Sequence, residues 1–350
     1  MDNNFQLIDS GRLFYPKLLA ESEKAMQNAT MGAKEHNLPA AEIRELFVNI
    51  DPIDTWDKAT QIVTSIHPDI YLTGVRNVFD DVMCLFDGSY PGYCHIQTPY
   101  HDLRHTLDVF ICAVRILHGV HVSGTPLSET EVSQIMVAAL LHDIGYAQKC
   151  HESTGSGAQF TQTHIPRGIK FMQDNLANWN LPEDWKTPLT LIIRCTEMNH
   201  KLSEIEFPDS RVKLQGQIVG SADMSGQMAD RAYLEKLLFL FLEFKEADIG
   251  NYKNIHDLLK KTRSFYDLMK ITLDGELGGV VHYLNMHFNE WIAINKNYYL
   301  ESVERNIAYL DKIIQLNESE WLSMLKRHGI VQKLVQINPA LLDTQSPVQS

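Results

Sequence analysis

The sequence predicts an all-α protein, and three observations lead to this expectation. Apolar residues recur at steps of three and four along most of the chain, which is the spacing of a helix face, whereas strand-like alternation is scarce. Two apolar stretches follow helix start signals: Thr98-Pro99 before one, and a capping box of Ser128 and Glu131 before the other. We find no internal repeat and no low-complexity segment, so the helices are expected to pack as a bundle.

The expected helices follow in chain order. The first covers 16–48 with a break near Pro39, and two more cover 54–67 and 71–87. A loop rich in Gly, Pro and Tyr then spans 88–98. Thr98 is expected to cap the next helix, which continues through apolar residues at helical spacing: Leu103, Leu107, Phe110, Val114 and Leu117.

The second half of the chain continues this pattern. Gly145 is expected to end the helix that the capping box starts, because glycine is common just after a helix. The tail after Asn338 is rich in Pro, Gln and Ser and is expected to fray. Further helices are expected over 165–178, 183–200, 212–228, 231–247, 252–271, 275–294 and 297–327.

Composition excludes several classes of protein. The chain has 350 residues, 44% of them hydrophobic and 21% charged, which is too apolar for an intrinsically disordered chain. A net charge of −13 argues against a protein that wraps nucleic acid. We read no signal peptide and no apolar stretch of about 18 residues, so neither secretion nor a membrane is expected. Five scattered cysteines without a CxxC pair favour reduced thiols and a cytoplasmic location.

The 15 histidines are the less ordinary number, and two of them lie at a helix start. His101 and His105 are four residues apart and therefore project from one face, one turn apart. They could share a metal, or one could bind metal while the other handles protons. The alternative is a pair of surface or core histidines with no such role.

Two aspartates sharpen this hypothesis. His142 and Asp143 directly follow an apolar AALL stretch, and Asp223 follows a stretch of small and apolar residues. A carboxylate at the buried end of a helix is costly unless it is paired or binds a cation. The alternatives are a simple His–Asp hydrogen bond, a helix end that touches solvent, and, for Asp223, a helix cap.

His164 and His200 complete the candidate set. His164 could instead flank a helix start, and His200 could lie near a helix C-terminus, where the helix dipole favours a cation. Taken together, imidazoles and carboxylates come from five separate helical segments. This is the pattern of a metal cluster inside a helical bundle.

These residues resemble the HD superfamily of metal-dependent phosphohydrolases, whose order H…HD…D is matched by His105, His142-Asp143 and Asp223. PYHDLRHTLDV is similar to the PYHNxxHAxDV signature of class I cyclic-nucleotide phosphodiesterases, with Asp102 and Thr106 as departures. The HDIGY and HIPRG segments resemble HD-GYP proteins, although the GYP element is absent. The resemblance covers 70–245.

The extent of the resemblance suggests a domain organisation. We expect an HD domain over 70–245, an N-terminal helical extension over 1–69 and a C-terminal helical extension over 246–350. The class I phosphodiesterase domains are all-helical and of similar length, so all three parts could also form one domain.

The resemblance also implies a chemistry. Two divalent metals (Fe, Mn, Zn, Ni or Mg) would be held by imidazoles and carboxylates, with Asp143 as the bridging ligand. Such a pair holds a hydroxide that attacks a phosphoryl group. By resemblance, His101 is the general acid for the leaving oxygen. The ligands of the first metal would be His105, His142, Asp143 and Asp223; those of the second would include His164 and His200.

The expected substrate is a small phosphorylated molecule, most specifically the phosphodiester of a cyclic nucleotide or a related signalling nucleotide. Three alternatives stay open: a phosphomonoesterase or nucleotide triphosphohydrolase of the same superfamily, a mixed-valent di-iron oxygenase, and a non-catalytic HD module. Asp102, Asp108 and Glu197 are candidates to orient a ligand imidazole. Roles as first-turn partners of the helix dipole or as exposed charges fit Asp102 and Asp108 at least as well. Three arginines could meet phosphate, but none stands out: Arg104, Arg167 and Arg194.

Overall fold

The computed structural model describes residues 51–152, 155–197 and 201–337, and these belong to one compact unit. Within this part of the chain the fold is all-α, as predicted: the regular elements are α-helices and short 3-10 helices, beside one isolated β-bridge between Tyr93 and Lys149. The helix expected over 16–48 and the tail after Asn338 lie outside the described residues. The division at 69/70 and 245/246 stays a prediction.

Helix α5 (Leu103–Val122) is the centre of the core. Every residue from His105 to Val120 is buried, and the helix contacts α3 (Pro52–Ile66), α6 (Glu129–Leu141), α9 (Ser210–Ala229) and α12 (Leu284–Ile292). It is the one described helix long and apolar enough to cross a membrane, but 89% of that stretch is buried inside the protein. Burial of this kind is typical of a core helix.

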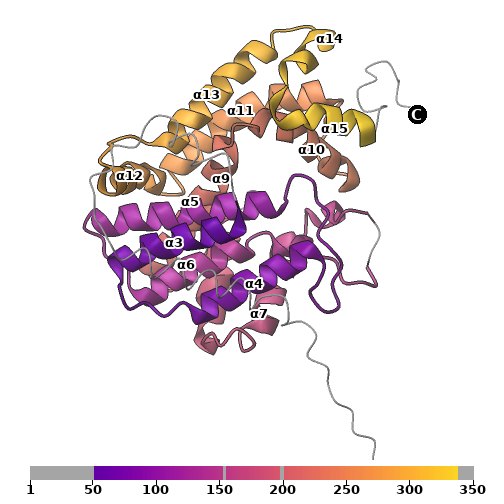
Figure 1. The fold of residues 1–350 in the computed structure, drawn as a ribbon. Coiled ribbons are helices and arrows are strands. Elements are labelled where there is room, and N and C mark those ends of the chain that lie inside the picture. The colour runs from indigo at the N-terminus through magenta and orange to yellow at the C-terminus, as the bar shows by residue number, and fades with distance from the viewer. Residues whose placement is uncertain (1–50, 153–154, 198–200, 338–350) are drawn as a thin grey trace, which may run out of the picture. The chain divides into compact units, whose positions relative to one another are not determined.

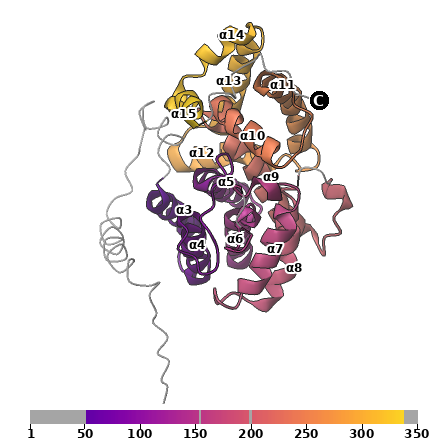
Figure 2. The same ribbon diagram turned by 90° about the vertical axis from the view of Figure 1, so that its right-hand side faces the viewer.

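The other helices pack around α5 and α9. Figures 1 and 2 show α4 (Thr73–Asp87), α6, α7 (His164–Asn175) and α8 (Lys186–Arg194) on one side of α5. A second group of helices lies on the other side: α10 (Tyr233–Glu246), α11 (Ile255–Asp274), α13 (Tyr298–Ile313), α14 (Glu318–Trp321) and α15 (Ile330–Ile337). Residues from both sides reach the start of α5.

The start of α5 differs from the prediction. The helix begins at Leu103, and its N-cap is Asp102, whose carboxylate accepts a hydrogen bond from the His105 amide at 2.9 Å. Thr98 instead donates its hydroxyl to the carbonyl of His101 in a preceding turn. The physical reason is that the amides of Tyr100 and His101 donate to the Glu243 carboxylate, which satisfies them outside a helix.

The end of α6 differs as well. The capping box is confirmed, with the Ser128 amide 2.7 Å from the Glu131 carboxylate, but the helix ends at Leu141 and not at Gly145. Gly145 lies in a 3-10 turn, Ile144–Tyr146, where a Cβ would stand 1.8 Å from the carbonyl oxygen of His164. A glycine is therefore required here for close approach of two backbones, not for a helix cap.

Three later expectations need correction. Helix α8 ends at Arg194, short of the expected 200, and the stretch 275–294 begins with a turn at Gly278 and Gly279, whose positive φ angles interrupt a helix. The expected helix 297–327 stops at Ile313 and is followed by short turns. Helix α15 was not predicted.

Candidate metal centre

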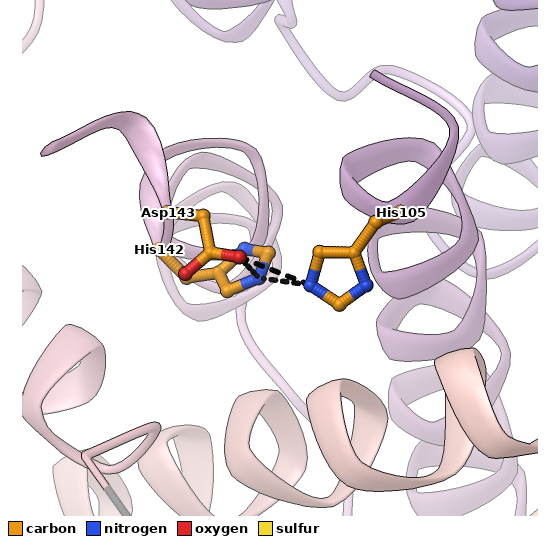
Figure 3. Close-up of side chains that lie close together, drawn as sticks. All are labelled: His105, His142 and Asp143. Carbon is orange, nitrogen blue, oxygen red and sulfur yellow. Dashed lines mark hydrogen bonds and ion pairs between the residues drawn. The ribbon is translucent and has the colours of Figure 1, made fainter. Parts of the chain in front are cut away.

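Three packed helices bring the central residues together. His105 lies in the first turn of α5, His142 and Asp143 follow the last residue of α6, and Asp223 lies on α9. All four are buried. Figure 3 shows the His142 ring and the Asp143 carboxylate facing the ring of His105 across the gap between the two helices.

The distances among these donor atoms are those of a metal site. His105 Nε2 lies 3.2 Å from His142 Nε2 and 3.0 Å from Asp143 Oδ2. Asp223 Oδ1 is 3.5 Å and 3.6 Å from the same two nitrogens. Metal–ligand bonds of about 2.0–2.2 Å at right or tetrahedral angles place neighbouring donors about 2.8–3.6 Å apart. The buried group of His105, His142 and Asp143 can therefore hold a metal ion.

The ring tautomers support the same conclusion. His142 Nδ1 lies 2.9 Å from the carbonyl oxygen of Ala139, and His164 Nδ1 lies 2.7 Å from that of Thr161. A carbonyl only accepts, so each Nδ1 carries a hydrogen, and in the neutral ring Nε2 holds the lone pair. Histidines that bind metals are oriented in this way by a second hydrogen bond. Asp143 Oδ2 is buried between the two rings, 3.0 Å from His105 Nε2 and 3.2 Å from His142 Nε2, where a cation bound by both nitrogens would also reach it.

The pKa shifts at the site show that its buried carboxylates are stabilised by positive charge beside them. Burial lowers the pKa of His142, but the Asp143 carboxylate outweighs this effect and raises it to about 9. Burial would raise the pKa of Asp143, yet His142 and His105 hold it well below its usual range. Burial raises the pKa of Asp223 to about 6. The two carboxylates therefore keep the His142 imidazolium as a cation beside them, and a bound metal ion would supply the same positive charge.

Asp143 faces two sets of donors. Its Oδ2 contacts His105 and His142, while its Oδ1 lies 3.4 Å from Nε2 of His164. The two oxygens of one carboxylate thus point to different imidazoles, which is the arrangement of a bridging ligand. His200, the other histidine proposed for the second metal, lies outside the described residues.

His101 is held beside the cluster by a residue that the sequence analysis missed. Its Nδ1 lies 2.5 Å from Oε2 of Glu243, a buried carboxylate on α10. Burial lowers the pKa of His101, but Glu243 outweighs this effect and raises it to about 9. The His101 ring packs edge-on against His105, with centroids 5.5 Å apart. Because Nδ1 pairs with Glu243, any proton exchange by this ring would involve Nε2.

Tyr146 is a second missed residue. Its buried ring stacks on His101 at 4.7 Å and on His164 at 4.7 Å, with interplanar angles of 20° and 10°. Its hydroxyl hydrogen-bonds to Thr161, the residue whose carbonyl accepts from His164. One aromatic ring therefore fixes the spacing of the proposed acid and a proposed metal ligand.

Asp223 is held in place by hydrogen bonds from Gln227. Gln227, one turn further along α9, donates its side-chain amide to the Asp223 carbonyl at 3.1 Å and lies 3.4 Å from Oδ1. The Tyr100 hydroxyl donates a hydrogen bond to the side-chain oxygen of Gln227. The PYH segment thus contributes to the site through Tyr100 as well as through His101.

The other charged candidates have structural partners. Asp102 is the N-cap of α5, a role that the sequence analysis assigned to Thr98. Asp108 is buried, and burial raises its pKa to about 8; its carboxylate lies 3.8 Å from Arg104. Arg167 donates to the carbonyls of Gly145 and Ala147 and pairs with Glu152. We therefore find Arg167 holding the HDIGY turn against α7 instead of facing phosphate.

A signal for Glu243 was present in the sequence. It is a carboxylate within an otherwise apolar run, Leu237 to Phe244, and the cost of burying it implies a partner. This is the argument that singled out Asp143. Tyr146 carries no such signal, because a buried tyrosine is an ordinary core residue.

Comparison with known proteins adds one match. A family model described as Npun_R2479-like matches residues 151–287, which is less than half of the chain. The matched stretch includes His164 and Asp223 and begins after Asp143. No curated protein and no solved structure matches the chain.

Proposed function

We propose that the protein is a metal-dependent phosphohydrolase of the HD type that cleaves a phosphodiester, most specifically in a cyclic nucleotide or a related signalling nucleotide. The observation that carries the proposal is the pairing of His101 with Glu243 at the edge of the buried histidine and aspartate group. A hydrolase needs both parts: donors for a metal, and an acid held next to them. The likeness of PYHDLRH and HDIGY to HD-superfamily motifs supports the same assignment.

Two divalent metals are proposed as cofactors. His105, His142, Asp143 and Asp223 would hold the first, and Asp143 Oδ1 and His164 would hold the second, with His200 as a further ligand. When bound, such metals supply Lewis acidity towards a phosphoryl group and lower the pKa of coordinated water. Imidazole and carboxylate donors suit Fe, Mn, Zn or Ni, with Mg at a carboxylate-rich position.

His101 is the proposed proton donor. Glu243 stabilises the imidazolium form and fixes the ring through Nδ1, so the proton at Nε2 is the one available for transfer. Cleavage of a phosphodiester leaves an alkoxide, and protonation of that oxygen in the transition state accelerates the reaction. Tyr146 keeps the His101 ring in place through stacking while the substrate binds.

The experiment combines metal analysis of purified protein with hydrolysis assays on cyclic nucleotides and an aryl phosphodiester. His101→Ala is expected to retain its metal content and to lose activity by roughly 10²–10⁴-fold, the usual contribution of a general acid. His95→Ala replaces an exposed histidine in the preceding loop and is the matched control, which should remain active. Full activity of His101→Ala would contradict the proposed role.

The same panel separates the alternatives. Hydrolysis of phosphomonoesters or nucleoside triphosphates alone would move the assignment to another branch of the same superfamily. Two tightly bound irons with oxygen uptake in the presence of an organic substrate would replace it with a di-iron oxygenase. Protein that binds no metal and shows no metal-dependent thermal shift would indicate a non-catalytic module.

A further inference from the structure

Two cysteines outside the metal centre lie together where two loops meet. Cys94 precedes the PYH segment, and Cys150 follows the HDIGY turn. The Cys94 amide donates to the Gln148 carbonyl at 2.9 Å, and the Cys150 amide donates to the Gly92 carbonyl at 3.1 Å. These two hydrogen bonds flank the isolated antiparallel bridge between Tyr93 and Lys149.

The bridge places both thiols on one face. In an antiparallel pair, side chains alternate between the two faces, so Cys94 and Cys150, each one residue from the bridge pair, project to the same side as diagonal neighbours. The two thiols hydrogen-bond to each other, which raises the pKa of Cys94. Cys150 is exposed and Cys94 is partly exposed, whereas Cys112 and Cys195 are buried.

We propose that Cys94 and Cys150 form a reversible intramolecular disulfide that ties these two loops together. The thiol pair is a redox site separate from the histidine and aspartate group. Its existence does not depend on the proposed hydrolase activity. All five cysteines are in the thiol form in this structure, so the proposal concerns a second, oxidised state of the protein.

A small disulfide such as oxidised glutathione is the proposed oxidant. The exposed Cys150 thiolate attacks one sulfur of glutathione disulfide, forms a mixed disulfide and releases one glutathione thiolate. The Cys94 thiolate then attacks the Cys150 sulfur, which forms the protein disulfide and releases the second glutathione. Two protein thiols are oxidised and one glutathione disulfide is reduced to two thiols, which take up the two protons that the protein thiols lose.

The geometry predicts a disulfide that is easily reduced. Diagonal neighbours in an antiparallel pair have Cα atoms about 7–8 Å apart, whereas a disulfide spans about 4.4–6.8 Å. Oxidation must therefore draw the two loops slightly closer together. Strained and exposed disulfides are the labile ones, which suits a reversible link more than a permanent one.

The link would act on the metal centre through short stretches of chain. Cys94 is seven residues before His101, and Cys150 is seven residues after Asp143. The same two segments already touch through the stacked rings of His101 and Tyr146. A disulfide at their far ends therefore constrains the pair of segments that positions the proposed acid.

The test uses the full-length protein, first reduced and then incubated with oxidised glutathione. Remaining thiols are alkylated, and the intact protein and its peptides are analysed by mass spectrometry. The expected product is about 2 Da lighter than the reduced protein before alkylation, contains a peptide linking Cys94 to Cys150, and reverts with dithiothreitol. Cys84→Ser should behave identically, whereas Cys94→Ser should retain glutathione on Cys150.

Two outcomes would overturn the proposal. One is wild-type protein in which glutathione persists on Cys150 while Cys94 is alkylated; the other is a link between different cysteines or between chains. Hydrogen exchange of the oxidised protein provides the second measurement. Slower exchange in peptides covering 92–101 and 143–150 is expected, and unchanged exchange in both would contradict the proposed link to the metal centre.

Discussion

Helix α5 contributes one histidine to each of two buried pairs, and the difference between the pairs bears on the candidate metal centre. Near its start, His105 Nε2 lies 3.2 Å from His142 Nε2. Near its end, His118 Nδ1 lies 3.3 Å from His287 Nδ1 on α12. The ring centroids are 5.2 Å apart in the first pair and 5.0 Å apart in the second. By ring geometry alone, the two pairs are nearly equivalent.

Their surroundings are opposite in charge. The first pair faces the carboxylates of Asp143 and Asp223. The pKa of His142 rises to about 9, whereas burial lowers that of His105 to about 4. Burial lowers the pKa of His118 to about 4, and burial together with Arg115 holds that of His287 well below its usual range. Of these two pairs, the first therefore combines close imidazoles with carboxylates, and it is the one that could hold a cation.

Removal of the central carboxylate should have the largest effect. Asp143→Asn keeps the shape of the side chain but leaves the first histidine pair without its nearest negative charge. Metal affinity is expected to fall by roughly 100-fold or more, beyond the loss typical for residues that only support a ligand. Metal content after dialysis and metal-dependent thermal shift measure this effect.

The matched control is an exposed ion pair on the same chain. Asp274 lies 2.8 Å from His282 at the surface, and Asp274→Asn should bind metal like the wild type. If Asp143→Asn retains its metal, the carboxylates do not explain why the first histidine pair, and not the second, is the candidate metal site.

Gly145→Ala tests the close backbone packing beside the first pair. The added Cβ would stand 1.8 Å from the His164 carbonyl and 2.7 Å from the Gly168 amide nitrogen. Both are backbone atoms that cannot swing aside, so a loss of about 3 kcal/mol in unfolding free energy is expected, at the upper end for overpacking. Chemical denaturation measures it.

Gly279→Ala serves as a comparison. A Cβ at this position would meet only the His282 ring, at 3.5 Å, but the positive φ of the residue also makes the substitution costly. A smaller loss for Gly145→Ala than for Gly279→Ala would show that α7 can move away from the HDIGY turn.

The second pair should make the fold sensitive to acid. His118 has a pKa of about 4 in the folded protein and about 6.5 when unfolded, so its contribution to stability is complete above pH 6.5. It is lost as the pH falls towards 4, because the unfolded state binds the proton first. Between pH 6.5 and pH 5, this histidine should account for roughly 2 kcal/mol of lost stability.

Denaturant unfolding at several pH values isolates this contribution. His118→Leu removes the titrating ring, and its stability should therefore fall less steeply over the same pH range than that of the wild type. Parallel losses in the two proteins would mean that His118 becomes protonated in the folded state without cost.

Glu243→Gln tests the carboxylate that holds His101 beside the first pair, and it has the smallest expected effect. The amide oxygen can still accept from the backbone amides of Tyr100 and His101, but the side chain no longer stabilises the His101 imidazolium. Activity on the best substrate should fall roughly tenfold with metal content unchanged, as for other residues that orient a functional histidine. Glu246→Gln changes the next turn of α10, where the carboxylate binds Ser156, and should have full activity. Equal activity of the two variants would remove Glu243 from the mechanism.

The sequence predicted those parts of the fold that local signals determine. The capping box at Ser128 and the amphipathic stretches of α10 and α11 led to nearly correct helix bounds. The start of α5 was misplaced because a residue 143 positions away, Glu243, takes the Tyr100 amide. No local pattern contains that information.

The candidate site followed the same rule. His142, Asp143 and Asp223 could be singled out because a carboxylate behind an apolar run needs a partner wherever the chain folds. The partner of His101 could not be identified in advance, since it depends on how α10 packs against the start of α5. Tyr146 was missed because its role arises from ring stacking, which leaves no trace in residue type.

An anomalous-scattering map from a crystal of metal-loaded protein tests the central claim most directly. A peak is expected between His105 Nε2, His142 Nε2 and the carboxylates of Asp143 and Asp223, with no comparable peak at His118 and His287. A map with density at the second pair, or with none at the first, would contradict the account.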